Sequence, residues 1–445
     1  MLTTPVPRLV TRLAIPTVIM QLITLVYNTA DTYFISQINA SASASVSAVF
    51  AIMSLIHAVG FGISMGSSSL CSIRLGEEKN EEADVILSSA FFAAFVLGTV
   101  LLAVGLSMQG VILNLIGCSE TMMPYARPYA LIMFLAAPIS CSSFCLTSSL
   151  RAEGQARLAM IGTVAGGLLN LVLDPVFIFS FGMGTAGAAL ATVLSQTVTF
   201  CIALSQFLRK KTIMHLKLCL ISRRFAVYWK IITTGLPTIF RQGLASVATA
   251  ALNKMAVPYG DAALAGVAIS NKCYMLVRQV VLGIGQGFQP AAGYNFGAKE
   301  YGRTRKCFSF VCVAGSIVCC ANAVVLAFFA EKILWWFCPD ETVVAVGKTA
   351  LLFACTVMPL MAFSTYVNQL YQCLGFRVQA TVLASCRQGI CFLPVVLILP
   401  RFIGVTGVQL AQPLADLLTC LISIPFAFFM LRRRLADRKS EDPVT

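Results

Sequence analysis

Apolar stretches of about 20 residues recur along the whole chain and constrain its fold more than any other feature. A run of that length is enough to cross the hydrocarbon core of a bilayer as a helix. Hydrophobic residues make up 58% of the 445 residues, and charged residues only 11%. Since a typical soluble domain carries about 25% charged residues, this surface could not be kept in water. The composition excludes a secreted enzyme, a nucleic-acid-binding domain and a disordered chain, and it predicts an all-α polytopic membrane protein.

The alternation of apolar runs with polar breaks predicts twelve transmembrane helices, six in each half of the chain. The first six are expected at residues 12–36, 46–71, 86–109, 123–148, 158–180 and 186–208. The second six are expected at residues 232–256, 264–291, 307–330, 346–370, 381–400 and 404–430. The longest polar interruption holds seven basic residues and separates the halves. We therefore predict an N-terminal lobe (1–208), a basic linker (209–230), a C-terminal lobe (231–430) and a basic tail (431–445).

The formal net charge of +14 is explained by where the basic residues lie. If the N-terminus is cytoplasmic, the segments on that side of the membrane hold 23 of the 32 Lys and Arg, against four on the other side. Cytoplasmic loops of membrane proteins carry this excess. Both termini are therefore predicted to face the cytoplasm, and no nucleic-acid partner is expected.

The two halves of the chain repeat in sequence with an offset of 221 positions, which becomes 220 near the ends of the halves. This offset pairs Pro16 with Pro237, Gln21 with Gln242, Gly62 with Gly283, Gly66 with Gly287, and Pro138 with Pro359. A duplicated unit with an even number of spans keeps its orientation in the membrane. The halves are then expected to be related by an axis along the membrane normal, with a central cavity between them that suits alternating access.

Carboxylates inside the predicted spans are the main candidates for a functional site, because an ionisable group in hydrocarbon is costly. Of the 18 acidic residues, only Asp31, Asp174 and Asp416 lie well inside a span. In the first predicted helix, Tyr27 and Asn28 precede Asp31 by four and three residues. The three side chains therefore share one face of that helix.

The fifth predicted helix carries a second polar group. Asn170 precedes Asp174 by four residues and shares its face. Pro175 cannot donate a backbone hydrogen bond to the Leu171 carbonyl, so it is expected to break the helix there. Broken helices of this kind commonly line ion sites. Thr192, in the sixth helix, can supply a further hydroxyl.

These residues offer oxygen ligands, which suit a hard cation such as Na⁺, and we predict a cation-coupling site with Na⁺ at Asp31, Asn170 and Asp174. The same two carboxylates could instead carry protons, because neighbouring buried carboxylates titrate as a coupled pair. A hydrogen-bonded cluster that only fixes helix packing is the structural alternative.

The second half lacks equivalent acids, since Leu252 and Val395 stand 221 positions after Asp31 and Asp174. Asp416 is its only intramembrane acid, and it is a candidate for an additional site. The half also places five basic residues in or near its spans, namely Arg241, Lys254, Lys272, Arg278 and Arg387. Such cations reach the interface, pair with an acid or contact an anionic group of a substrate.

No GxxxxGK[ST] motif occurs in the chain, so no ATP site of its own is expected. No Ser/His/Asp, Cys/His or zinc constellation occurs either, and we expect neither an enzyme activity nor a cofactor. The energy for transport is therefore expected to come from an ion gradient or from the gradient of the substrate itself.

The sequence resembles the multidrug and toxic compound extrusion (MATE) family over nearly its whole length. It is most similar to the MepA-like bacterial members and, at the ion site, to the DinF type. The resemblance is carried by PTVIMQLITLVYNTAD (16–31), LNLVLDP (169–175), GTAGAALAT (184–192) and GIGQGFQPAAGYNFGA (283–298). It implies two six-helix bundles around a V-shaped cavity in a bacterial inner or plasma membrane. The family's N-lobe cation site maps onto Tyr27, Asp31, Asn170, Asp174 and Thr192, where H⁺ or Na⁺ would bend the first helix and release a drug outward.

The sequence thus predicts a monomeric secondary antiporter that exports amphipathic organic compounds in exchange for H⁺ or Na⁺. One alternative is a flippase of the same superfamily for lipids or lipid-linked precursors, although such relatives usually have fourteen spans. Another is a major-facilitator transporter, whose loop after the second span reads like GxxxDRxGRR. This chain has RLGEEKNEEAD at 74–84 instead.

Overall fold

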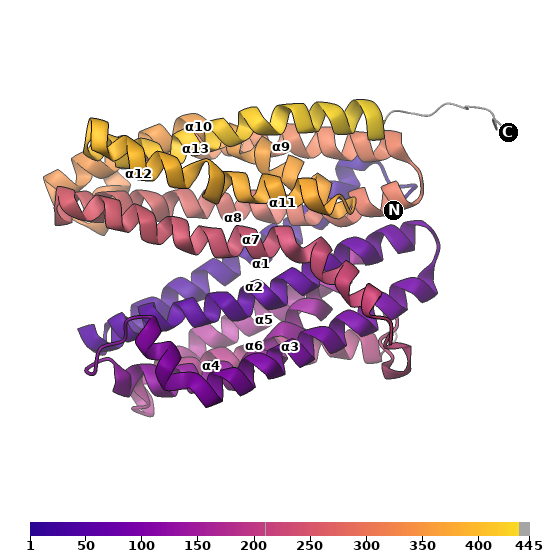
Figure 1. Cartoon of the computed structure of the whole chain (residues 1–445), viewed down its shortest axis with the longest axis horizontal. Coiled ribbons are helices and arrows are strands. Elements are labelled where there is room, and N and C mark those ends of the chain that lie inside the picture. The colour runs from indigo at the N-terminus through magenta and orange to yellow at the C-terminus, as the bar shows by residue number, and fades with distance from the viewer. Residues whose placement is uncertain (210, 436–445) are drawn as a thin grey trace. The chain divides into compact units, whose positions relative to one another are not determined.

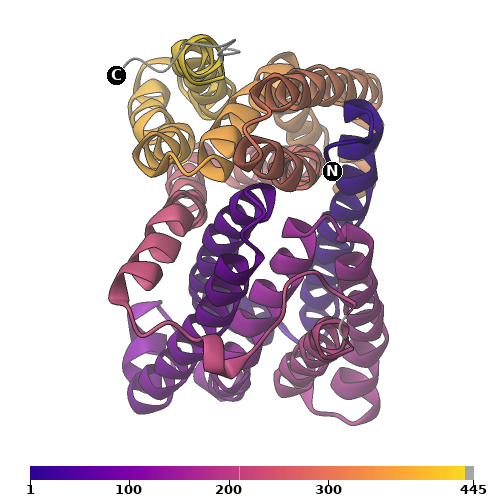
Figure 2. The same ribbon diagram turned by 90° about the vertical axis from the view of Figure 1, so that its right-hand side faces the viewer.

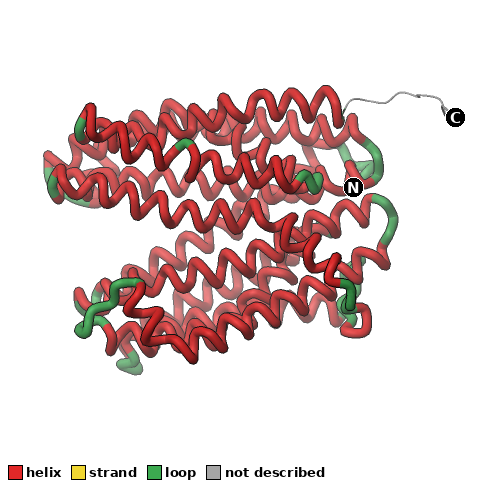
Figure 3. The backbone as a smooth tube through the Cα atoms, in the orientation of Figure 1, coloured by secondary structure: helices red, strands yellow, loops and turns green. Residues whose placement is uncertain are grey.

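The protein is described by a computed structural model over residues 1–209 and 211–435, and its regular structure there is entirely helical (Figure 3). The N-terminal half forms α1 (Val6–Ser36), α2 (Ala40–Gly76), α3 (Asn80–Leu115), α4 (Met123–Ala152), α5 (Ala156–Pro175) and α6 (Gly184–Leu208). The C-terminal half forms α7 (Phe225–Ala256), α8 (Asp261–Gly297), α9 (Tyr301–Phe337), α10 (Glu341–Cys373), α11 (Arg377–Ser385), α12 (Phe392–Ile403) and α13 (Val405–Phe429) (Figure 1). Helices satisfy every backbone group internally, which the hydrocarbon demands.

Within the described residues a helical rod lies at each of the twelve predicted positions, because a π turn at Cys386–Ile390 joins α11 and α12 into one rod. In the part of the chain that the structure describes, eleven rods are apolar and long enough to cross a membrane by length and composition. The twelfth rod, α7, carries the polar pair Arg241 and Gln242 in its middle, which lowers its hydropathy. Most rods extend beyond the predicted bounds. Helix α3, for example, starts at Asn80 because acidic residues in its first turn suit the positive end of a helix.

Close contacts group the chain into two compact units, each described by itself. The N-half unit contains Ile15–Leu75 and Lys79–Gly243. The C-half unit contains Met1–Ala14, Gly76–Glu78 and the described residues from Leu244 onward. The start of α1 therefore belongs with the C-half unit, and the first half of α7 belongs with the N-half unit. The predicted tail beyond residue 435 lies outside the described residues.

Glycines at equivalent positions of the repeat hold these exchanged helix segments. A Cβ added to Gly66 of α2 would lie 2.1 Å from the carbonyl oxygen of Ile231 in α7. A Cβ added to Gly287 of α8 would lie 2.5 Å from the Cα of Ala14 in α1. Neither position has room for a side chain. The second helix of each half therefore receives the first helix of the other half in the same way, as a duplicated fold requires.

The segment between α6 and α7 crosses the helix ends of the N-half unit (Figure 2) and is held there by buried carboxylates. Glu153 accepts hydrogen bonds from the backbone N–H groups of Ile213 at 2.9 Å and Met214 at 3.1 Å. Asp84 of α3 accepts one from the backbone N–H of His215 at 2.7 Å. The predicted linker is therefore a specifically bound segment rather than a free tether.

Glu153 is expected to make this contact depend on pH. Burial raises the pKa of its carboxyl from 4.5 to about 7; the two backbone N–H donors oppose the rise, and the charge of Asp84 adds to it. The unfolded chain thus releases this proton near pH 4.5 and the folded chain near pH 7. The stability contributed by Glu153 therefore falls as the pH rises through that window and is constant above it.

We expect the Tm of the wild-type protein to fall more steeply between about pH 4.5 and about pH 7 than the Tm of Glu153→Gln. Across this pH range, the free energy of unfolding of the wild-type protein should fall by about 1–3 kcal/mol more than that of the variant. The amide loses one acceptor at every pH, which shifts the whole curve but not its slope. Thermal unfolding in detergent at several pH values measures both slopes, and parallel curves would contradict the assignment.

Candidate functional site

Two intramembrane carboxylates meet inside the N-half unit. Asp31 of α1 and Asp174 of α5 are both buried and lie close enough to interact electrostatically. Tyr129 of α4 is close enough to interact electrostatically with both carboxylates, and its hydroxyl donates to Sδ of Met53 at 3.3 Å. The structure therefore brings together two acids that stand far apart in the sequence.

Asn170 links the second carboxylate to α6. Its Nδ2 donates to Oδ1 of Asp174 at 3.1 Å and to Oγ1 of Thr192 at 3.4 Å. All three side chains are buried. One helical turn separates Asn170 from Asp174, and the close packing of α5 on α6 supplies the third group.

Tyr27 and Asn28 of α1 lie differently with respect to this cluster. A Cβ added to Gly167 of α5 would lie 3.3 Å from Cδ1 of Tyr27, so the tyrosine ring rests on α5 one turn before Asn170. Tyr27 also interacts electrostatically with Asp31. Asn28 instead donates to the carbonyl oxygen of Thr24 in its own helix, at 2.8 Å.

Three buried oxygen atoms of the cluster have no hydrogen-bond donor within the described part of the chain. They are Oδ1 of Asp31, Oδ1 of Asn170 and Oδ2 of Asp174. A buried acceptor left without a partner costs about 1–3 kcal/mol. A Na⁺ ion or protons would satisfy these atoms and also neutralise charge in a site of low polarity.

The α-helical hydrogen-bond pattern ends at Pro175, where a break was predicted, but the chain stays helical beyond it. Helix α5 reaches Pro175, whose backbone is helical, and it continues as a π turn over Val176–Ser180. The wide turn lies after the proline, where the backbone N–H of Phe181 donates to the carbonyl oxygen of Val176 at 3.0 Å. The irregular turn still lies directly after Asp174.

Asp416 of the C-half unit is fully buried and paired. Its Oδ1 lies 2.8 Å from Nε of Arg387 and 3.3 Å from Nε2 of Gln412, and its Oδ2 accepts from the hydroxyl of Tyr274. Nη2 of Arg387 donates to that same hydroxyl at 2.5 Å. Arg387 stands in the π turn between α11 and α12. Among the predicted additional residues, Asp416 is therefore part of an ion pair, while Arg241 is a half-buried residue of α7.

Two tyrosines in these clusters are not among the residues proposed from the sequence. Tyr129 and Tyr274 lie on α4 and α8, away from the acids along the chain. Their only signal in the sequence is a polar ring within an apolar span. That signal is weak, because tyrosine is also common at membrane interfaces.

Comparison with known proteins gives relatives and structures that cover nearly the whole chain. The multidrug export protein MepA of Staphylococcus saprophyticus is 24% identical over 429 residues, covering 96% of this chain and 94% of the relative. MepA of Staphylococcus aureus strain NCTC 8325 is 25% identical over 440 residues, covering 98% of this chain and 96% of the relative. A crystal structure of MATE in the straight conformation superposes with a TM-score of 0.91 at 24% identity, covering 96% of both chains. The structure of a MOP superfamily transporter from Pyrococcus furiosus superposes with a TM-score of 0.91 at 23% identity, covering 98% of both chains.

The MatE family model matches the chain twice, at residues 16–176 and 237–398. The two matches begin 221 positions apart, which is the offset of the internal repeat. Each match starts at the proline of the first helix of its half and spans most of that half. Together they cover well over half of the sequence, and the chain belongs to the MatE family.

Proposed function

We propose that this chain is a secondary active transporter that exports amphipathic organic compounds in exchange for H⁺ or Na⁺ by alternating access. It acts as a monomer in a bacterial inner or plasma membrane, with both termini in the cytoplasm. The export function is supported by the multidrug export proteins that the chain matches almost end to end. The orientation is supported by the gathering of basic residues in alternate loops.

The observation that carries the coupling role is the set of three unsatisfied oxygen atoms on Asp31, Asn170 and Asp174. A carboxylate pair in a water-poor site is unstable when both members are charged and alone, so the site favours binding of a cation. Binding changes the electrostatics between α1 and α5, and the transported drug responds to that change. The site thereby couples the movement of the cation to the movement of the drug.

One translocated charge at about 100 mV supplies about 2.3 kcal/mol. That energy sustains a concentration ratio of roughly 50 for the exported compound. The coupling ion is a transported substrate and not a resident cofactor. We therefore propose that the cluster has a role in transport rather than in catalysis.

Membership of the MatE family removes the major-facilitator alternative. Ethidium efflux from everted vesicles tests the proposal, with a proton gradient and a sodium gradient applied separately. We expect concentrative ethidium transport under one of the two gradients and none without a gradient. Lipid scrambling in proteoliposomes without ethidium transport would favour the flippase instead.

A further inference from the structure

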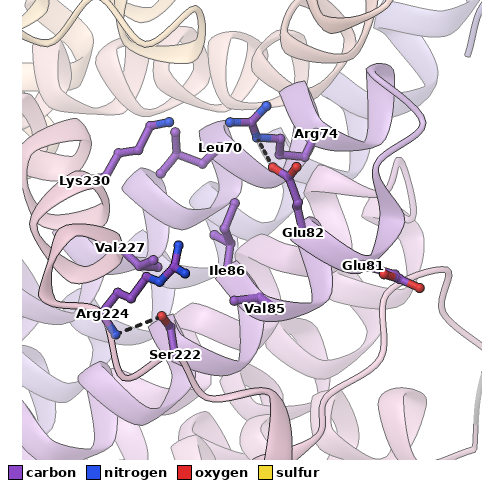
Figure 4. Close-up of a pocket in the computed structure, with 10 residues that line it drawn as sticks. All are labelled: Leu70, Arg74, Glu81, Glu82, Val85, Ile86, Ser222, Arg224, Val227 and Lys230. Carbon is purple, nitrogen blue, oxygen red and sulfur yellow. Dashed lines mark hydrogen bonds and ion pairs between the residues drawn. The ribbon is translucent and has the colours of Figure 1, made fainter.

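A cavity of about 510 Å³ lies in the N-half unit where the end of α2, the start of α3 and the start of α7 meet (Figure 4). We call it the basic cavity, after three of its lining residues: Arg74, Arg224 and Lys230. It is separate from the carboxylate cluster, because it shares no residue with it. The proposed coupling mechanism does not use it.

The cationic side chains of the basic cavity extend toward one space (Figure 4). Arg74 is partly neutralised, since its Nε lies 3.1 Å from Oε2 of Glu82. Glu81 also lines the cavity but points away from the cations in Figure 4. The Arg224 guanidinium makes no hydrogen bond or ion pair with any residue that the structure describes. The cavity therefore retains positive charge toward a ligand.

The start of α7 adds to this positive field. The helix begins at Phe225, directly after Arg224, and it runs for 32 residues. Its first N–H groups carry the positive end of the helix dipole. The hydroxyl of Ser222, which also lines the cavity, accepts the backbone N–H of Arg224 at 3.2 Å and so orders the approach to the helix.

The remaining wall of the basic cavity is apolar. Leu70 of α2, Ile86 of α3 and Val227 of α7 line it beside the cations. A free phosphate would leave this wall in water, whereas an acyl chain would cover it. A cationic compound would be repelled by the basic side chains that line the cavity.

An exposed aromatic pair places the cavity at the edge of the membrane. The rings of Phe225 and Trp229 stack with centroids 6.3 Å apart, and 74% and 56% of their surfaces are exposed. Aromatic residues of this kind gather at the level of the lipid headgroups. The orientation given under the proposed function puts this end of α7 at the cytoplasmic leaflet.

We propose that the basic cavity binds one anionic phospholipid of the cytoplasmic leaflet. Its phosphate lies between Arg224, Lys230 and the first turn of α7, and the start of an acyl chain lies on the apolar wall. Basic pockets between helices on the cytoplasmic side recognise anionic headgroups in this way. The lipid connects α7 to α2 and α3 and stabilises the N-half unit.

Titration of the delipidated, detergent-solubilised full chain with phosphatidylglycerol tests this proposal. The readouts are the Tm and the lipid retained in native mass spectrometry. We expect wild-type protein to retain one phosphatidylglycerol and to gain thermal stability from it. Phosphatidylcholine, which is neutral, and glycerol phosphate, which has no acyl chain, should give neither effect.

Arg224→Gln combined with Lys230→Gln is expected to weaken phosphatidylglycerol binding by about tenfold or more. The control combines Arg223→Gln with Lys217→Gln, which removes the same charge from exposed residues outside the cavity, and it should bind as wild type does. Arg224→Gln alone serves if the double variant folds poorly, because this guanidinium has no partner within the described residues. Equal binding by the variant and the control would overturn the proposal, as would an equal response to phosphatidylcholine or glycerol phosphate.

Discussion

Asp31→Asn and Asp174→Asn are each expected to abolish ion-driven drug efflux while the protein accumulates in the membrane at normal levels. The amide has nearly the shape of the acid, but it can neither bear the negative charge that attracts Na⁺ nor take up and release a proton. The roughly 50-fold concentration ratio that one charge sustains at about 100 mV should fall toward unity. Ethidium efflux from everted vesicles, normalised to the amount of transporter, measures this loss.

Thr29→Ala is the matched control for these two variants. Thr29 lies on α1 two residues before Asp31, is exposed, and donates its hydroxyl to the carbonyl oxygen of Leu25 in the same helix. It should keep wild-type efflux. If both asparagine variants still build up the wild-type ratio, the two acids are not the coupling groups and the cluster only fixes helix packing.

Removing one partner of the buried pair in the C-half unit is expected to have the second large effect. Asp416→Asn leaves the Arg387 guanidinium charged, only 12% exposed and without its counter-ion. Breaking a buried pair in this way costs about 3–5 kcal/mol. We expect a clear fall in Tm and in the yield of folded protein. The double variant Asp416→Leu with Arg387→Met, which buries no charge, should recover much of the loss.

The exposed ion pair between Glu331 and Lys348 is the control for this experiment. Its atoms are also 2.8 Å apart, but both side chains are about half exposed. Glu331→Gln should leave the Tm unchanged, because solvent screens such pairs. If Asp416→Asn is as harmless as Glu331→Gln, the buried pair does not stabilise the fold.

Much of the fold was predictable because the bilayer imposes simple rules on sequence. Each span needs a long apolar run, and the polar breaks between runs are plain. The duplication was visible in the sequence as well, since Gly66 and Gly287 stand at the offset of the repeat. In the structure each of these glycines packs against the backbone of a neighbouring helix. Asn170 and Asp174 were predictable as a pair because they stand one turn apart on a single helix.

Contacts between helices were harder to predict. Nothing in the sequence says that Tyr129 of α4 lies near Asp31 of α1, because that proximity depends on how two helices rotate against each other. The π turns are equally hidden. The proline at 175 signals a disturbance, but whether the helix breaks or widens depends on its neighbours, and no proline marks the turn that carries Arg387.

The exchange of the starts of α1 and α7 between the two units also escapes sequence reasoning. The natural boundary in the sequence is the polar segment 209–230, which suggested whole helices on either side. Contacts instead divide α1 after Ala14 and α7 after Gly243. The exchange of helix starts becomes visible only when glycines are seen to pack against the backbone of another helix. The sequence shows where the glycines are, but it does not show which helix each of them contacts.

Parallel measurement of cation flux and ethidium flux in proteoliposomes tests the coupling site most directly. Wild-type protein should move H⁺ or Na⁺ opposite to ethidium at a fixed ratio. The double variant Asp31→Asn with Asp174→Asn should still exchange labelled for unlabelled ethidium but carry no cation with it. Uphill ethidium transport by that double variant, accompanied by cation flux at the wild-type ratio, would contradict the assignment of coupling to these two carboxylates.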